Sequence, residues 1–179
     1  LSDSDYEIST LFQLSKSEGA LSTQEIYEKV LPSVVGITSK FIYEEEVISN
    51  PFGSFFGYNY GDRETTSREI PATGTGIIMS SDGYVITNAH VVYSAQYGGK
   101  AGSVSVLLYD GQEYQADIVG YDTQTDVAVL KVHDAPSLTA AEFGDSSALN
   151  VGDSAIAIGN PLGFDLFGTL TVGYISGLN

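Results

Sequence analysis

The 179-residue sequence contains no cysteine. This absence excludes disulfide bonds, thiolate metal sites and cysteine nucleophiles together. Basic residues are also few, because 7 Lys and Arg stand against 23 Asp and Glu and give a formal net charge of −16. A surface of this sign repels phosphate groups, so we expect neither nucleic acid nor an anionic membrane surface as a partner.

Long apolar runs are missing as well. No run of the sequence approaches the length of a membrane span, and we expect no membrane insertion in this segment. No acidic stretch has the spacing of an EF-hand calcium loop, so we also expect no specific metal site.

The sequence is rich in residues typical of strands and tight turns. It has 20 glycines and 12 tyrosines, and 42% of its residues are hydrophobic. Short β-like runs recur at intervals of about eight to twelve residues. Asp82-Gly83 and Asp110-Gly111 lie between such runs and predict type I′ hairpin turns. The pattern predicts an all-β fold, an antiparallel barrel or sandwich.

Two β units follow one another along the chain. Ser22 and Glu25 form a capping box that opens a short helix, and Pro32 ends it. We expect strands of the first unit over 33–41, 76–79, 84–87, 103–108, 113–120 and 127–132, and strands of the second over 153–159 and 168–177.

These elements divide the chain into four parts. Residues 1–21 are a linker or N-terminal arm, and residues 22–133 are the first barrel. Residues 134–152 connect the two units, and residues 153–179 begin a second barrel that they do not complete.

The first barrel carries a long loop over residues 42–72, which we expect to be irregular. It is acidic at Glu44–Glu46 and aromatic between Phe52 and Tyr60. An irregular segment of this length is usually functional or mobile. Its rings either cover the chain's own core or form a self-association or regulatory loop, and the sequence leaves both readings open.

His90 follows the strand 84–87. Its position alone is typical of a structural histidine at a strand end, and the other reading is a general base. A histidine performs this role when a carboxylate accepts from its Nδ1–H, because the carboxylate fixes the tautomer and stabilises the imidazolium. Asp126 directly precedes the apolar strand 127–132 and is the candidate partner, although an aspartate at such a position is usually a turn or cap residue. We therefore expect a buried Asp126 with a carboxylate oxygen within hydrogen-bond reach of His90 Nδ1.

Three stretches carry a family resemblance. GTGIIMSSDGYVITNAHVV, which ends at Val92, resembles the histidine segment of HtrA/DegP trypsin-like serine proteases, and YDTQTDVAVLKV resembles the segment of their triad aspartate. VGDSAIAIGNPLG resembles the start of their second barrel. The resemblance implies a chymotrypsin-like antiparallel β-barrel with a short N-terminal helix, in which the first barrel is complete and the second is begun.

The resemblance also implies an activity. His90 and Asp126 would be catalytic residues of a serine endopeptidase that acts on unfolded or damaged proteins and needs no cofactor. It further implies a homo-oligomer, a trimer in this family, or a complementary C-terminal part as a partner. An extracytoplasmic location (periplasmic, cell-surface or secreted) follows from it too.

The nucleophile of the family is missing from the sequence. That serine lies in a G-N-S-G-G motif, and no serine after Asp126 has such glycine neighbours. We expect that the chain stops before the nucleophile and is inactive alone. The alternative is a protease-derived, non-catalytic binding or assembly module.

Overall fold

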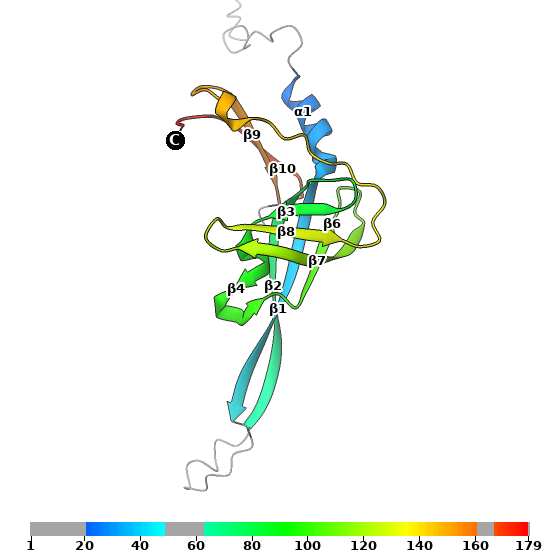
Figure 1. Ribbon diagram of the computed structural model, residues 1–179, viewed down its shortest axis with the longest axis vertical. Helices are drawn as coiled ribbons and strands as arrows, with labels where there is room; N and C mark the ends of the chain where they lie inside the picture. Colours follow the sequence, from blue (N-terminus) through cyan, green and yellow to red (C-terminus); the bar gives the residue numbers. More distant parts are fainter. Residues whose placement is uncertain (1–20, 49–62, 161–166, 179) are drawn as a thin grey trace, which may run out of the picture.

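The computed structural model describes residues 21–48, 63–160 and 167–178. Six antiparallel strands close a barrel in the order β1-β2-β3-β8-β7-β6, with β6 pairing back onto β1 (Figure 1). The strands are β1 (Val34–Ile48), β2 (Arg63–Ile78), β3 (Tyr84–Thr87), β6 (Ser103–Leu107), β7 (Glu113–Asp122) and β8 (Val127–Val132). The predicted all-β barrel is confirmed.

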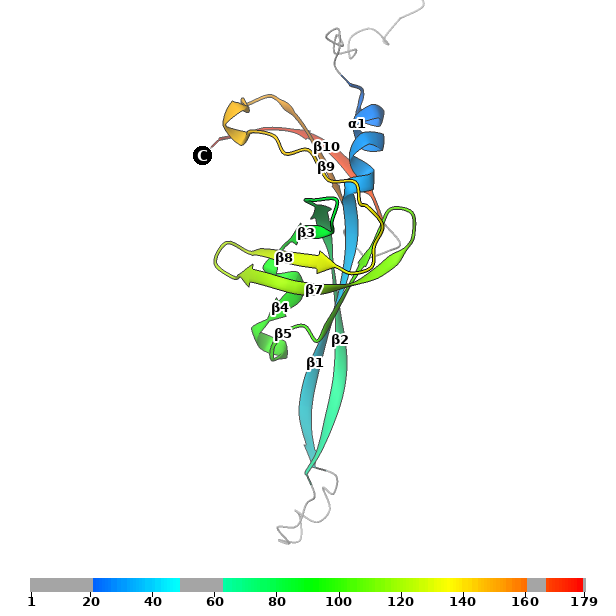
Figure 2. The ribbon, with the colours of Figure 1, turned by 45° about the vertical axis from the view of Figure 1, so that its right-hand side comes forward.

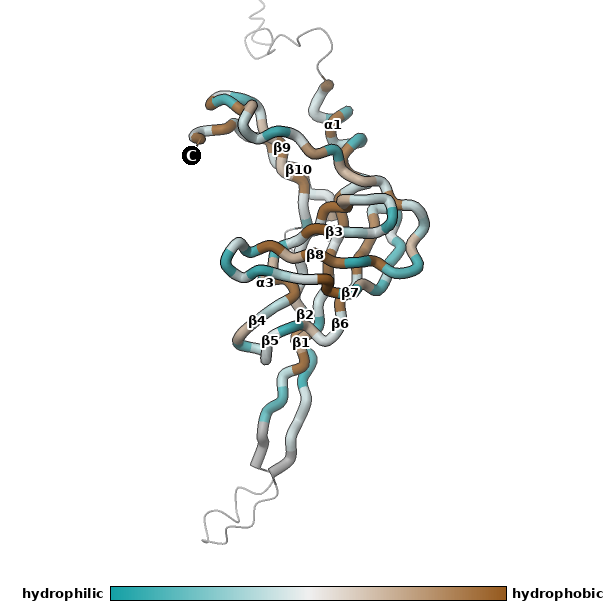
Figure 3. The backbone as a smooth tube through the Cα atoms, viewed as in Figure 1, coloured by the Kyte–Doolittle hydropathy of each residue, from teal (hydrophilic) through white to brown (hydrophobic). Residues whose placement is uncertain are grey.

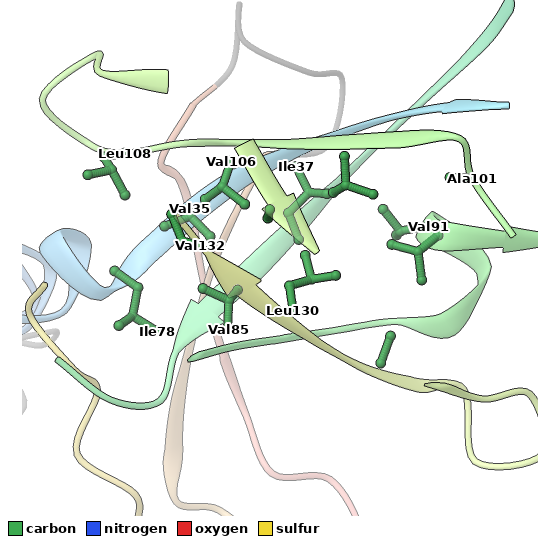
Figure 4. Packing of buried hydrophobic residues seen from close by; sticks show 14 of the residues in the cluster. Val35, Ile37, Ile78, Val85, Val91, Ala101, Val106, Leu108, Leu130 and Val132 are labelled. Atoms are coloured by element: carbon green, nitrogen blue, oxygen red, sulfur yellow. The ribbon is translucent and has the colours of Figure 1, made fainter. Parts of the chain in front are cut away.

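The interior of the barrel is filled by side chains that alternate along the strands. Val35, Ile37 and Phe41 of β1 point inward at every second or fourth position and are almost completely buried. Residues of β2, β3, β6 and β8 meet them there, as Figure 4 shows for Ile78, Val85, Val106 and Leu130. Burying each such side chain contributes about 1.5–3 kcal/mol.

Two glycines of β2 allow the strand to lie close to its neighbours. A Cβ on Gly76 would lie 2.7 Å from Cγ1 of Val85 and 2.8 Å from Cδ1 of Ile37. A Cβ on Gly74 would lie 2.5 Å from Cγ2 of Val91. Glycine is therefore needed at both positions. Because Gly74 has no side chain, β2 can lie against α3 (Ala89–Val92), the segment that carries His90.

The expected irregular loop over residues 42–72 is corrected by the structure. Residues 42–48 and 63–72 continue β1 and β2 as a paired antiparallel ribbon, in register from Ile42 opposite Glu69 to Ile48 opposite Arg63. The ribbon projects from the barrel (Figure 2) and is mostly hydrophilic (Figure 3). Backbone hydrogen bonds and cross-strand ion pairs, such as Arg68 with Glu45 at 3.7 Å, hold its two strands together. The aromatic residues 52–60 lie outside the described residues.

The two predicted type I′ turns are also corrected. A type I′ turn needs positive φ at both central residues, but only Gly83 and Gly111 have it, at 104° and 83°. Asp110 instead accepts a hydrogen bond from the N–H of Gln112 at 3.0 Å, in the manner of an Asx turn.

The remaining elements lie at the ends of the barrel. Helix α1 (Thr23–Val30) begins with the predicted capping box, and the η2 turn (Leu31–Ser33) leads into β1. Strands β9 (Ser154–Gly159) and β10 (Thr169–Tyr174) form a separate two-stranded sheet. Figures 1 and 2 show α1 and this sheet on the opposite side of the barrel from the ribbon.

The segment after α3 forms a small hairpin. Strands β4 (Tyr93–Ser94) and β5 (Gly99–Lys100) pair on either side of the η3 turn (Ala95–Tyr97). Within the described residues, no helix has the length and apolar character needed to cross a membrane.

Candidate active site

His90 lies on α3 (Ala89–Val92), a single helical turn that directly follows β3. Ala89, Val91 and Val92 on either side of it are buried in the core. They anchor the turn, while the His90 side chain points out of the barrel and is 71% exposed. The apolar residues next to the histidine thus hold its backbone, and the imidazole remains accessible.

Asp126 lies at the end of the turn that joins β7 to β8. Its φ of 55° is in the left-handed region, where aspartate is among the better tolerated residues. Its Oδ2 lies 2.8 Å and its Oδ1 3.0 Å from Nδ1 of His90. The predicted contact between these two side chains is confirmed.

Two further groups fix the Asp126 carboxylate. The backbone N–H of His90 donates to Oδ1 at 3.0 Å. Nδ2 of Asn88 donates to Oδ2 at 3.1 Å and to the backbone carbonyl of Asp126 at 3.2 Å. The carboxylate is therefore oriented by a backbone group and an amide as well as by the imidazole.

These donors keep the carboxyl group ionised. The hydrogen bond from the backbone N–H of His90, followed by the bond from its side chain, lowers the pKa of Asp126 below its usual 3.8. An ionised carboxylate can only accept, so Nδ1 of His90 carries the proton in this contact. In the neutral ring, Nε2 then has a free lone pair, as a general base requires.

Asp126 is less buried than the sequence predicts. Its side chain is 44% exposed, because no described residue covers its outer side. A hollow of about 320 Å³ adjoins it, lined by Thr75, Ile77, Ile86, Thr87, Asn88, Asp126, Val127 and Ile158. The hollow lies where the first barrel meets β9.

Asn88 and Asp122 support the site from its edges. No role for Asn88 was predicted from the sequence, although its position two residues before His90 was a signal that could have indicated one. Asp122 accepts from the N–H of Gln124 at 2.9 Å and from Oγ1 of Thr125 at 3.0 Å. It thereby shapes the turn that delivers Asp126.

The other histidine is not part of this arrangement. Nε2 of His133 pairs with Asp117 at 2.9 Å on the barrel surface. In the described part of the chain, no serine hydroxyl hydrogen-bonds to His90. Across residues 21–48, 63–160 and 167–178, no three histidine or carboxylate side chains group closely enough to hold a metal ion.

Comparison with known proteins gives relatives of one kind. The Serine protease Do-like HtrA of Bacillus subtilis is 40% identical over 167 residues, which are 92% of this chain and 34% of that protein. The Periplasmic pH-dependent serine endoprotease DegQ of Escherichia coli is 38% identical over 159 residues, 88% of this chain and 33% of that protein. The chain thus spans about a third of the length of these relatives.

A solved structure agrees with them. An HtrA-type protease with a decapeptide superposes with a TM-score of 0.68 and 32% identity, covering 87% of this chain and 45% of that one. The family model of the trypsin-like peptidase domain matches residues 74–179, which include His90 and Asp126. The chain therefore belongs to the trypsin-like peptidase domain family, is similar to HtrA/DegP serine proteases, and has a chymotrypsin-like barrel.

Proposed function

We propose that this chain is the histidine- and aspartate-bearing part of a serine endopeptidase. In this proposal His90 is the general base and Asp126 is the group that orients it. The observation that carries the proposal is the pair of contacts from the Asp126 carboxylate to Nδ1 of His90, at 2.8 and 3.0 Å. This geometry leaves Nε2 as the basic atom of an exposed ring.

The reaction would then follow the logic of a catalytic triad. Nε2 of His90 takes the proton of a serine hydroxyl as the serine attacks the peptide carbonyl, and returns it to the leaving amine. Asp126 stabilises the imidazolium formed in between. The sequence has no G-N-S-G-G string, so the proposal takes the serine from outside these 179 residues.

We further propose unfolded or damaged polypeptides as substrates and an extracytoplasmic location. The names of the relatives support both, because one is called periplasmic and a solved HtrA-type protease carries a decapeptide. The net charge of −16 would favour basic peptide segments. A homo-oligomer, a trimer by resemblance, belongs to the same proposal.

A chimera tests the activity. Residues 1–179 are joined to the part of the Bacillus subtilis relative that follows its matched region, and casein hydrolysis is measured. We expect hydrolysis by the chimera and none by the 179-residue chain alone, because the nucleophile and its oxyanion donors are then missing. His90→Ala should abolish the activity of the chimera.

The second histidine supplies the matched control. His133→Ala removes an imidazole that also pairs with an aspartate, and it should leave hydrolysis by the chimera unchanged. A folded chimera that does not hydrolyse casein would contradict the enzyme proposal and favour the non-catalytic module. Equal activity of the His90→Ala chimera would contradict the role of His90.

A further inference from the structure

Asn160 is a buried polar residue away from the His90–Asp126 pair. It directly follows β9 and is only 4% exposed. Its backbone N–H donates to Oγ1 of Thr75 on β2 at 2.8 Å, and its Oδ1 accepts from the N–H of Gly168 at 2.9 Å. Asn160 therefore makes both contacts through its backbone N–H and its Oδ1. Its Nδ2 has no hydrogen-bond partner among the described residues.

Thr75 connects Asn160 to the active-site turn. While the Thr75 side chain accepts from Asn160, its backbone carbonyl accepts from Oγ1 of Thr87 at 2.8 Å. Thr87 is buried and is the last residue of β3. The next residue, Asn88, caps α3 and donates to Asp126. A continuous path of hydrogen bonds and chain therefore runs from the end of β9 to the His90–Asp126 pair.

Helix α1 contacts Gly168, the residue directly before β10. The hydroxyl of Tyr27 donates to the carbonyl of Gly168 at 3.0 Å. Gly168 has φ of 71°, and a Cβ there would lie 2.8 Å from the Tyr27 hydroxyl and 2.9 Å from Cδ1 of Leu31. Only glycine satisfies both conditions. Residues on the two sides of the β9–β10 connection are thus fixed between β2 and α1.

Directional contacts set position more narrowly than apolar ones. Ile158 of β9 lines the hollow beside Ile77 and Ile86, and such aliphatic surfaces can slide past one another with little change in buried area. A hydrogen bond from a particular N–H to a particular hydroxyl weakens steeply with displacement. The bond between Asn160 and Thr75 therefore restricts where the end of β9 lies relative to β2.

We propose that Thr75 and Asn160 form a polar clamp that positions the β9–β10 sheet relative to the His90–Asp126 pair. Thr75 is then a positioning residue of the active site, acting through Thr87 on one side and Asn160 on the other. The functional part of this inference rests on the proposed function, in which the second β unit begins at β9 and leads to the serine.

The clamp itself is tested on the 179-residue chain by amide hydrogen exchange. Thr75→Val keeps the side-chain shape and removes the acceptor, whereas Thr75→Ser keeps the hydroxyl. We expect Thr75→Val to speed exchange at Asn160 by about two- to tenfold, the effect of one net hydrogen bond. Thr75→Ser should stay close to the parent chain.

Thr73→Val is the matched control on the same face of β2, because Thr73 is exposed and two residues away. It should leave exchange at Asn160 unchanged, and barrel amides of β6 to β8 should report intact folding in all three variants. Unchanged protection of Asn160 in Thr75→Val would overturn the clamp.

The positioning role is tested in the casein-hydrolysing chimera. We expect Thr75→Val to lower kcat severalfold with little change in KM, since it misplaces catalytic groups and not the bound peptide. Thr75→Ser should restore kcat. Faster exchange in Thr75→Val with an unchanged kcat would overturn the positioning role. An inactive parent chimera would count against the proposed function alone, because the exchange experiment decides the clamp independently.

Discussion

Two groups besides the His90 imidazole orient Asp126. The backbone N–H of His90 and the amide of Asn88 both donate to its carboxylate. Its left-handed φ turns the side chain back toward α3 from the start of β8. The base and its partner are thus parts of one local hydrogen-bonded unit, which the first barrel assembles by itself.

The lowered pKa of Asp126 predicts a pH-dependent contribution to stability. The folded chain holds this proton less tightly than the unfolded chain, whose carboxyl has the usual pKa of 3.8. The contribution is therefore present above about pH 4 and is lost as the pH falls through the folded pKa. We expect the destabilisation caused by Asp126→Asn, measured by urea unfolding, to be largest near neutral pH and to shrink in acid.

Asp134→Asn is the control for this measurement. Asp134 also has a positive φ, of 53°, so asparagine changes the backbone preference equally at the two sites. Its substitution measures, at neutral pH, how much asparagine changes the unfolding free energy at such a backbone position. A constant difference for Asp126→Asn between neutral and acid pH would contradict the assignment of an ionised, hydrogen-bonded carboxylate.

At the level of elements, the sequence predicted the strands that face a core. The strand expected over 127–132 coincides with β8, and the capping box at Ser22 begins α1 as predicted. Both depend on local signals, namely apolar alternation and a side chain that meets the N–H three residues ahead.

The outer ribbon of β1 and β2 could not be predicted in the same way. Thr65, Thr66 and Ser67 of β2 are consecutive and all exposed, so the described side chains of this part of the ribbon do not alternate between a buried and an exposed face. The contacts of Thr75 with Asn160 join residues 85 positions apart, and no local pattern marks them. The pairing of His90 with Asp126 was predicted because both lie in segments that resemble those of a known family.

Gly76 provides a prediction at the level of strand packing. Gly76→Ala places a methyl group within 2.8 Å of Val85 and Ile37, so we expect destabilisation by about 1–3 kcal/mol from overpacking. Denaturant unfolding measures it. Gly120→Ala on β7 is the matched change, because a Cβ there meets nothing within 4 Å. Gly120→Ala should be neutral or mildly stabilising, and equal effects of the two substitutions would contradict the close packing of β2 on the core.

At the scale of the whole molecule, the β9–β10 sheet differs from the closed barrel. The six barrel strands close on themselves, whereas β9 and β10 pair only with each other among the described strands. Val172 and Tyr174 of β10 are 51% and 61% exposed. Open strand edges beside exposed apolar side chains favour pairing with another chain.

We therefore expect the 179-residue chain to self-associate through residues 153–179. The net charge of −16 opposes association, and salt should strengthen it, since the Debye length falls from about 30 Å at 0.01 M to about 8 Å at 0.15 M ionic strength. Light scattering at several concentrations should show a mass that rises with concentration and with salt. Fraying of β9 and β10 is the alternative outcome, visible as fast amide exchange there.

A pair of valine substitutions locates the interface. Val172→Lys should weaken the association, whereas Val119→Lys on β7 should not, although Val119 is equally exposed at 58%. A strictly monomeric chain with β9 and β10 protected from hydrogen exchange would contradict both outcomes.

The central claim is that His90 is held as a general base by an ionised Asp126. Nitrogen-15 NMR of the imidazole, recorded on the 179-residue chain at a pH where the ring is neutral, tests it most directly. We predict a proton on Nδ1, a free Nε2, and loss of this preference in Asp126→Ala, with His133 as an internal reference. A ring protonated mainly on Nε2, or a tautomer indifferent to Asp126→Ala, would contradict the account.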